Sequence, residues 1–299
     1  MRVLVTGASG LIGRHTIAAL GERGVAIRTF QRSAPLSAAV EHVNGDVRTD
    51  RAELCRAARG CDVIVHLAGR GDVAESRRDP VGYGELNASG TLHALEAARH
   101  AGAALVFAGT QRVYPPRPEP CHEDDVLQPD SPYGYAKWVA ELWCRMISEH
   151  FGVATTILRF FSVYGPGQQS NSGSGVVTIF SRAAMANQPL VVQSAGKRDF
   201  TDARDVARAI CRVVEPPSAP RHRVYNIATG HGTTFRDLAE LVVTITGARS
   251  AVEEHIDEPP GRDLVADISR ARSELGYEPC VPLCEGLERY VEWLRQNSA

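Results

Sequence analysis

Short apolar segments alternate with amphipathic segments through the first half of the chain. The apolar segments have the length of buried strands, and the amphipathic ones carry apolar residues at helical spacing. The expected strands cover residues 3–5, 26–30, 40–43, 62–67, 104–108 and 155–161. The expected helices cover residues 11–24, 50–59, 79–100 and 131–150. Strands that alternate with helices form parallel βαβ units, so the pattern predicts an α/β fold with a Rossmann-type doubly wound parallel sheet.

The regular alternation ends near Gly165-Pro166-Gly167. A Ser/Gly/Asn-rich loop is expected next, over residues 168–175. Beyond it the pattern predicts helices over 176–187, 234–247, 269–275 and 283–296, a turn and helix over 198–214, and a strand over 224–227. We therefore expect a dinucleotide-binding domain over residues 1–167 and a smaller mixed α/β C-terminal substrate lobe over residues 168–299. The segment at about 201–230 is expected to pack back onto the first domain.

The turn after the first strand carries three glycines, Gly7, Gly10 and Gly13. Glycine lets the backbone come close to an anion, and the N–H groups and positive dipole at the start of the following helix face it. Gly10, Leu11 and Ile12 lie at that helix start. The sequence thus predicts a phosphate site. A tight turn with close helix–sheet packing is the alternative, because the spacing differs from the common dinucleotide fingerprint.

Composition excludes several classes of function. The 299 residues carry a formal net charge of −2, so no strong field attracts the chain to nucleic acid or to a membrane. No apolar run reaches the length of a membrane span, and the first expected strand begins too early for a signal peptide. The seven scattered cysteines lack zinc-site spacing, so we expect no metal, and they suit free thiols in a reducing cytoplasm.

The second expected strand ends without the acidic residue that often holds the ribose in NAD-binding units. Arg28 and Arg32 stand there instead, and a guanidinium suits a 2′-phosphate. This favours NADP(H) over NAD(H) as the cofactor, with solvated surface arginines as the alternative. Asp46 follows the third strand and is placed to reach an adenine ring. A flat turn against which the cofactor could lie is formed by Leu67, Ala68 and Gly69.

Tyr133 and Lys137 are four residues apart near the start of an expected helix, so their side chains share one face. A nearby ammonium favours the phenolate, which would lower the tyrosine pKa and make it a general acid or base near neutral pH. An ordinary amphipathic pair is the alternative, but the chain has only one other lysine, Lys197. Thr110 follows the fifth strand, and its hydroxyl could bond either the same substrate oxygen or local backbone.

Several short motifs occur in a fixed order along the chain. They are TGASGLIG at 6–13, GDV at 45–47, HLAG at 66–69, Asn87 with Gly90-Thr91, VY at 113–114, SPYGYAK at 131–137, LRFFSVYGP at 158–166, RDF at 198–200, Asp205-Val206, YNI at 225–227 and ELGY at 274–277. With these motifs the chain resembles the extended short-chain dehydrogenase/reductase family, in particular the NAD(P)-dependent nucleotide-sugar epimerase/dehydratase group. The resemblance covers nearly the whole chain.

The resemblance implies a role for each site residue. Tyr133 would be the acid/base, Lys137 would bind the nicotinamide ribose, and Thr110 would fill the Ser/Thr position. The cofactor would contact Gly7, Gly10, Leu11, Ile12, Gly13, Arg32, Asp46, Val47, Leu67, Ala68, Gly69, Asn87, Tyr133, Lys137 and Phe160. The substrate would contact Thr110, Gln111, Arg112, Ser162, Arg198 and Arg262. A homodimer is implied as well, through a four-helix interface made by the helices over 79–100 and 131–150.

Departures from the family pattern narrow the expected reaction. Gln111 and Arg112 replace the acid pair of the sugar dehydratases, so 4,6-dehydration is not expected. Ser162 replaces the usual asparagine, Gly109 replaces a serine, and Arg262 is out of register with a second diphosphate-binding arginine. The expected activity is reduction of a nucleotide-linked 4-keto-sugar by hydride transfer, with Tyr133 as general acid. The alternatives are an NAD-dependent 4-epimerase, a reductase of a non-sugar carbonyl and a non-catalytic NADP-binding regulator.

Overall fold

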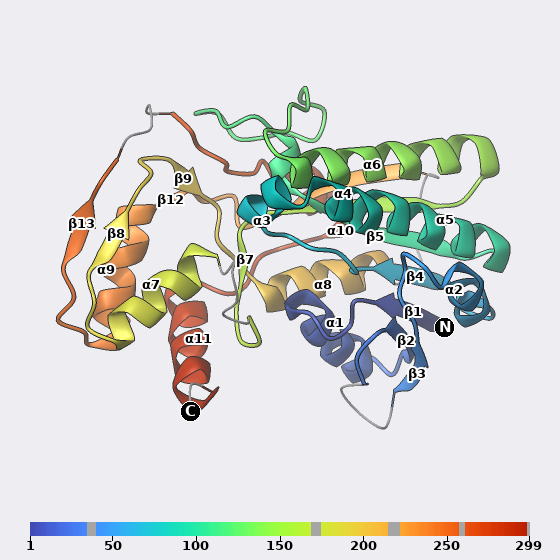
Figure 1. Ribbon diagram of the computed structural model, residues 1–299, viewed down its shortest axis with the longest axis horizontal. Helices are drawn as coiled ribbons and strands as arrows, with labels where there is room; N and C mark the ends of the chain where they lie inside the picture. Colours follow the sequence, from blue (N-terminus) through green and yellow to red (C-terminus); the bar gives the residue numbers. More distant parts are fainter. Residues whose placement is uncertain (35–39, 169–174, 215–221, 257–260, 298–299) are drawn as a thin grey trace.

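A seven-stranded parallel sheet forms the centre of the computed structural model, which describes residues 1–34, 40–168, 175–214, 222–256 and 261–297 (Figure 1). In spatial order its strands are β11 (His222–Ile227), β6 (Thr155–Phe160), β5 (Ala104–Thr110), β4 (Val63–His66), β1 (Arg2–Thr6), β2 (Ala26–Gln31) and β3 (Glu41–Asn44). Every neighbouring pair is parallel. The expected Rossmann-type fold is confirmed, and a crevice is expected where the strand order reverses beside β1.

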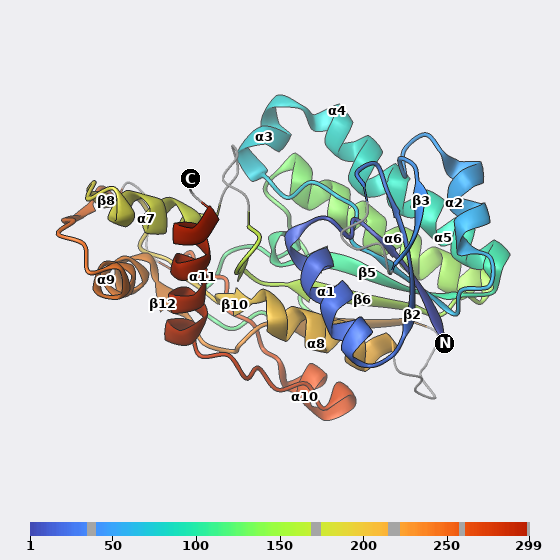
Figure 2. The same cartoon turned by 90° about the horizontal axis from the view of Figure 1, so that it is seen from below.

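Helices cover both faces of this sheet. One face carries α2 (Arg51–Ala58), α5 (Gly90–Ala101) and α6 (Pro132–Phe151). The other carries α1 (Leu11–Glu22), α8 (Ala203–Val214) and α10 (Ser269–Leu275), as Figure 2 shows. The strands are apolar on both sides because they are buried on both sides: Leu4 packs into the first core, and Val3 and Val5 pack into the second.

The long helix expected over 79–100 is present as a continuous helical run over residues 80–101. It consists of α4 (Pro80–Tyr83), a π-helical segment, η1 (Gly84–Ser89), and α5, and the π-helical segment was not predicted. The short helix α3 (Val73–Arg78), for which no helix was expected, precedes it. Asp72 caps α3 by accepting from the Glu75 N–H at 3.0 Å, and Asp79 caps α4 by accepting from the Gly82 N–H at 3.0 Å. The cap at Asp79 marks the start of the long helix and separates it from α3.

The C-terminal part, which lies on the left of Figure 1, has an apolar core of its own. It contains α7 (Val176–Met185), α9 (Phe235–Thr246), α11 (Leu283–Asn297) and the pair β8 (Leu190–Val192) with β13 (Val252–Glu254). Two further pairs are β7 (Val163–Tyr164) with β10 (Thr201–Asp202), and β9 (Lys197–Arg198) with β12 (Thr233–Thr234). These strands are too short to show alternation in the sequence.

α8 packs against α1, and β11 joins the central sheet beside β6, so the chain returns to the first part after residue 200. The boundary between the two predicted domains stays a prediction. Most of the loop expected over 168–175 lies outside the described residues.

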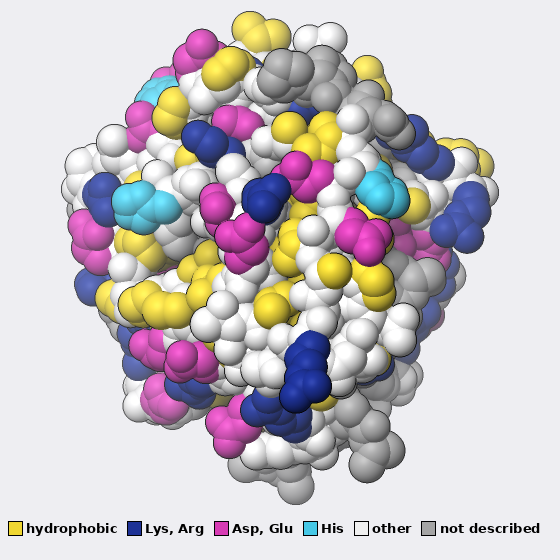
Figure 3. All heavy atoms as spheres, turned by 90° about the vertical axis from the view of Figure 1, so that its left-hand side faces the viewer, with side chains coloured by type: hydrophobic (Ala, Val, Ile, Leu, Met, Phe, Trp, Pro, Cys, Tyr) yellow, Lys and Arg dark blue, Asp and Glu magenta, His cyan; other side chains and the backbone are white. Residues whose placement is uncertain are grey.

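On the face turned toward the viewer in Figure 3, acidic and basic side chains are interspersed. None of the helices in the described ranges is both long enough and apolar enough to cross a membrane.

Candidate active site

Two cavities lie along the carboxyl ends of the central strands, and both include Gly7. The larger has a volume of about 810 Å³ and the smaller about 460 Å³. Of the predicted site residues, the larger is lined by Gly7, Gly10, Leu11, Ile12, Gly13, Leu67, Thr110, Gln111, Arg112, Tyr133, Lys137, Phe160 and Ser162. The smaller is lined by Gly7, Arg32, Asp46, Val47, Ala68 and Gly69. Residues far apart in the sequence therefore form one elongated site.

The three glycines of the turn serve two purposes: two of them allow close backbone packing, and the third leaves room for a ligand. Gly7 has φ +68°, and a Cβ there would lie 2.6 Å from the Ala68 nitrogen. A Cβ on Gly13 would lie 2.4 Å from the Gly7 oxygen, so both positions need glycine for packing. At Gly10 a Cβ would meet only the Gly7 oxygen, at 3.4 Å. Gly10 lines the larger cavity and leaves the start of α1 without a side-chain cap, so the first N–H groups suit a phosphate of a dinucleotide.

The smaller cavity distinguishes the two arginines proposed for a 2′-phosphate. Arg32 lines it, with its side chain 73% exposed and 3.9 Å from Asp46. Arg28 does not line it, because its guanidinium donates to the Ala57 carbonyl at 2.6 Å and pairs with Glu41 at 2.8 Å. The assignment of Arg28 to the cofactor is therefore wrong.

Arg48 was missed by the sequence reasoning, although it stands only two residues after Asp46. It lines the smaller cavity and pairs with the Asp46 carboxylate at 2.7 Å. Hydrogen bonding to Arg48 is the main reason that the pKa of Asp46 is lowered. At the end of β2, Gln31 accepts from the Ser9 N–H at 3.0 Å and so ties the glycine turn to this cavity.

Tyr133 lies in the first turn of α6, where Ser131 caps the helix by accepting from the Gly134 N–H at 3.2 Å. Its side chain is half-buried and shares the wall of the larger cavity with Thr110. Burial raises the pKa of the phenol, whereas the nearby Thr110 hydroxyl and the positive charge of Arg112 lower it. The expectation that Lys137 lowers this pKa is not met, since its ammonium is engaged elsewhere.

The ammonium of Lys137 is buried, and its Nζ donates to the Ala108 carbonyl at 2.8 Å. It also lies 4.7 Å from the centre of the Phe107 ring. Burial lowers the pKa of this amine to about 8. Lys137 is therefore fixed at the end of β5, on the same cavity wall as Tyr133, and is mostly charged at neutral pH.

The predicted substrate residues divide among several places. Gln111 donates to the Ser162 hydroxyl at 3.0 Å, so these two form one wall. A third cavity, of about 190 Å³, is lined by Arg112, Ser162 and Arg198. The Arg198 guanidinium donates to the Arg262 carbonyl at 2.8 Å and lies 5.2 Å from the Phe235 ring centre. Arg262 lines none of these three cavities. Its contribution to the site is the backbone carbonyl that accepts from Arg198.

Asn87 is buried and bonds the backbone of Arg70 through both ends of its amide, each at 3.0 Å. It lines neither of the two larger cavities, although a Cβ on the neighbouring Gly69 would lie 2.6 Å from its Oδ1. Asn87 thus holds the strand end beside the cavities. Sequence reasoning did not identify the segment after β4 that Asn87 holds. This segment lines the larger cavity with Arg70, Gly71, Asp72, Val73 and Ala74.

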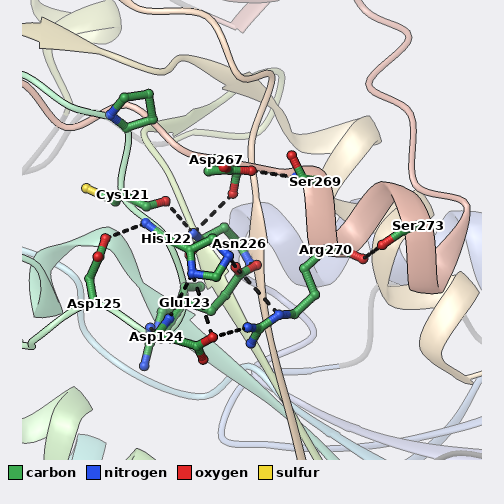
Figure 4. A network of polar contacts seen from close by, with 12 residues as sticks. Cys121, His122, Glu123, Asp124, Asp125, Asn226, Asp267, Ser269, Arg270 and Ser273 are labelled. Carbon is green, nitrogen blue, oxygen red and sulfur yellow. Dashed lines mark hydrogen bonds and ion pairs between the residues drawn. The ribbon is translucent and has the colours of Figure 1, made fainter.

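A polar network outside these three cavities holds the segment between β5 and α6 (Figure 4). The Asn226 N–H in β11 donates to the Glu123 carboxylate at 2.8 Å, and the Asn226 amide donates to the Cys121 carbonyl at 2.8 Å. Arg270 of α10 lies 2.5 Å from the Asp124 carboxylate. In addition, Arg159 donates to the Glu123 carbonyl at 3.0 Å. The segment between β5 and α6, which begins with Gln111, is thereby fixed to the central sheet.

Comparison with known proteins gives one family. The model of the NAD dependent epimerase/dehydratase family matches residues 3–228. A UDP-glucose 4-epimerase of Mycolicibacterium smegmatis is 32% identical, with all of both chains aligned. The UDP-glucose 4-epimerase of Thermotoga maritima, solved with UDP-glucose, has a TM-score of 0.90 and 29% identity over 100% of both chains. The Thermus thermophilus UDP-glucose 4-epimerase, solved with NAD, has a TM-score of 0.89 and 29% identity over 99% of both chains.

Proposed function

The chain belongs to the NAD-dependent epimerase/dehydratase family and is an NAD(P)-dependent enzyme of the extended short-chain dehydrogenase/reductase type, and on that premise we propose that it epimerises a uridine-diphosphate sugar at C4. The observation that carries this proposal is that Thr110, Tyr133 and Lys137 line one cavity together with the uncapped start of α1. The names of similar proteins support the 4-epimerase alternative over the 4-keto-reduction that the sequence favoured.

The cofactor's pyrophosphate would be bound by the N–H groups at the start of α1, and its adenosine would occupy the smaller cavity. When bound, NAD(P) supplies hydride acceptance and donation. Tyr133 takes the proton of the sugar 4-hydroxyl as C4 is oxidised and returns it as C4 is reduced. Thr110 bonds the same oxygen and holds it against the phenol. Lys137 would place positive charge beside the nicotinamide ribose. Arg198 meets the substrate diphosphate.

The test is to incubate the purified protein with UDP-glucose or UDP-glucuronate and catalytic NAD, without added reductant, and to follow the sugar by NMR. An epimerase converts a large excess of sugar over cofactor, because hydride is returned in each cycle. Absence of a 4-epimer from every UDP-sugar offered would refute the proposal.

A second candidate function is net reduction of a 4-keto-sugar with NADPH. It rests on Arg32, which lines the adenosine cavity, and on the absence of an acidic residue at the end of β2. If Arg32 binds a 2′-phosphate, Arg32→Ala reduces the preference for NADPH over NADH about 10-fold or more. Arg23→Ala, an exposed arginine near the end of α1, is the control. An unchanged preference in Arg32→Ala would leave this second function without support.

A homodimer is also proposed, through α6 and the neighbouring segment from α4 to α5, which lie alongside each other in Figure 1. α6 exposes a stripe of apolar side chains at helical spacing: Tyr135 and Leu142 are each 50% exposed, and Val139 is 37% exposed. Two copies that pair through this face would bury the stripe.

A further inference from the structure

Arg112 carries positive charge into the active site without an acidic partner. Its side chain is half-buried and lines both the larger cavity and the third cavity. Within the described parts of the chain, its guanidinium makes neither an ion pair nor a hydrogen bond. Arg70 in the same cavity, in contrast, pairs with Glu75 and Asp79. A partly desolvated guanidinium is costly when unpaired, so its partner is expected to come from a ligand.

The backbone of Arg112 is fixed between two of the proposed catalytic residues. Its N–H donates to the Thr110 hydroxyl at 3.2 Å. Its carbonyl packs against the start of α6, where a Cβ on Gly134 would approach it to 2.6 Å. The charge of Arg112 also acts on the Tyr133 phenol, since it lowers the pKa of that group. The guanidinium is therefore held within electrostatic reach of the oxygen that would exchange a proton with the sugar.

The balance of charge around the larger cavity favours an anion. Its described lining contains the basic residues Arg78, Arg112 and Lys137, besides Arg70, whose charge is balanced by Glu75 and Asp79. Asp72 is the one acidic residue in that described lining, and its carboxylate is engaged in capping α3. The coenzyme pyrophosphate is accounted for by the start of α1, which lies beside Gly10. The charge of Arg112 is thus left for the substrate.

We propose that the sugar is a hexuronate and that Arg112 binds its carboxylate. This inference rests on the proposed 4-epimerisation, which places C4 at Tyr133 and the diphosphate at Arg198. The hexose then spans the region where the two cavities meet, and Arg112 lines both. In a hexuronate the carboxylate is attached to C5, the ring carbon next to C4. A guanidinium can bind such a carboxylate through two parallel hydrogen bonds.

The experiment measures dissociation constants of UDP-glucuronate, UDP-glucose and UDP for the NAD-loaded protein by calorimetry. The wild type should bind UDP-glucuronate about 10- to 100-fold more tightly than UDP-glucose. Arg112→Gln should remove most of that ratio, and Arg112→Lys should keep part of it, because lysine supplies the charge without the planar fork. Arg77→Gln removes an exposed arginine near the same rim that does not line the cavity, and should keep the ratio.

Other outcomes would overturn the inference. If Arg112→Gln weakens both sugars and UDP equally, Arg112 binds the diphosphate. If wild-type protein binds UDP-glucose as tightly as UDP-glucuronate, or neither sugar more tightly than UDP, no carboxylate is recognised. Failure of the proposed function is separate: it would be seen as absence of a 4-epimer from the sugar that binds, whatever the binding ratio.

Discussion

Tyr133 shows how the environment of one residue sets its chemistry. Burial alone raises the pKa of its phenol and would keep it protonated, while Thr110 and Arg112 oppose that effect. An oxidised nicotinamide bound in this site would add positive charge near the phenol. In the proposed mechanism, Tyr133 would therefore exchange a proton only once the site is filled.

Replacement of Tyr133 by Phe removes the proton donor and acceptor and keeps the ring. Turnover of the sugar substrate should fall by about 10²- to 10⁴-fold, because general acid–base groups contribute that much. Tyr135→Phe is the matched control, since Tyr135 is exposed on the same helix and outside the cavity, and it should change turnover by less than about twofold. Steady-state kinetics of wild type and both variants measure the turnover. A Tyr133→Phe protein within about threefold of wild type would contradict the assignment.

His66 predicts a dependence of stability on pH. It is fully buried at the end of β4, with Nδ1 2.8 Å from the Thr6 hydroxyl. Burial, with a smaller effect of the Lys137 charge, lowers its pKa from 6.5 to about 3. Below pH 6.5 the unfolded chain takes up a proton that the folded chain does not. Its contribution to stability is therefore lost progressively as pH falls from about 6.5 toward 3.

Between pH 7 and pH 5 this linkage should cost about 2 kcal/mol of the free energy of unfolding. Urea denaturation of wild type and His66→Asn at both pH values measures it. The variant has no titratable side chain at position 66, so its free energy of unfolding should fall by about 2 kcal/mol less than that of wild type over the same pH interval. Equal losses in the two proteins would show that His66 is not the responsible group.

At the scale of an element, α1 contains two glycines with opposite roles. A Cβ on Gly13 would meet the Gly7 and Ala8 backbone at 2.4 and 2.6 Å, whereas a Cβ on Gly21 meets nothing within 4 Å. Gly13→Ala should lower the free energy of unfolding by about 1–3 kcal/mol through overpacking. Gly21→Ala should raise it by about 0.5–1 kcal/mol, because alanine is the better helix former. Thermal and urea denaturation distinguish the two. A stabilised Gly13→Ala protein would show that the turn tolerates displacement.

At the scale of the whole molecule, the apolar stripe on α6 predicts the assembly. Val139→Glu places a charge in the middle of the stripe and should convert a dimer into a monomer, because a buried unpaired carboxylate opposes association. Light scattering after gel filtration measures the mass. Val126→Glu is the control, since Val126 is 83% exposed on a different part of the surface. A wild-type monomer, or a dimer that survives Val139→Glu, would rule out this interface.

The parts of the molecule that depend on local spacing were determined by the sequence. Buried parallel strands need apolar runs, which predicted the central sheet. The Gly7–Gly13 turn and the Tyr133–Lys137 pair were also visible, because a turn of fixed geometry and a four-residue helical spacing are short-range patterns. Helices α6, α8 and α11 were predicted within a few residues for the same reason.

The tertiary structure alone decided the features that depend on distant partners. The Ala57 carbonyl and Glu41 draw Arg28 away from the cofactor, while Arg32 stays at its cavity. Arg28 lies within β2 and Arg32 directly follows it, and the sequence alone did not show which of the two reaches the cavity. Lys137 likewise donates to the carbonyl of Ala108, a residue distant in the sequence, and this long-range hydrogen bond was not predicted. Sequence spacing fixes which residues share a helix face, but long-range packing decides which charge is neutralised and which, as at Arg112, is left for a ligand.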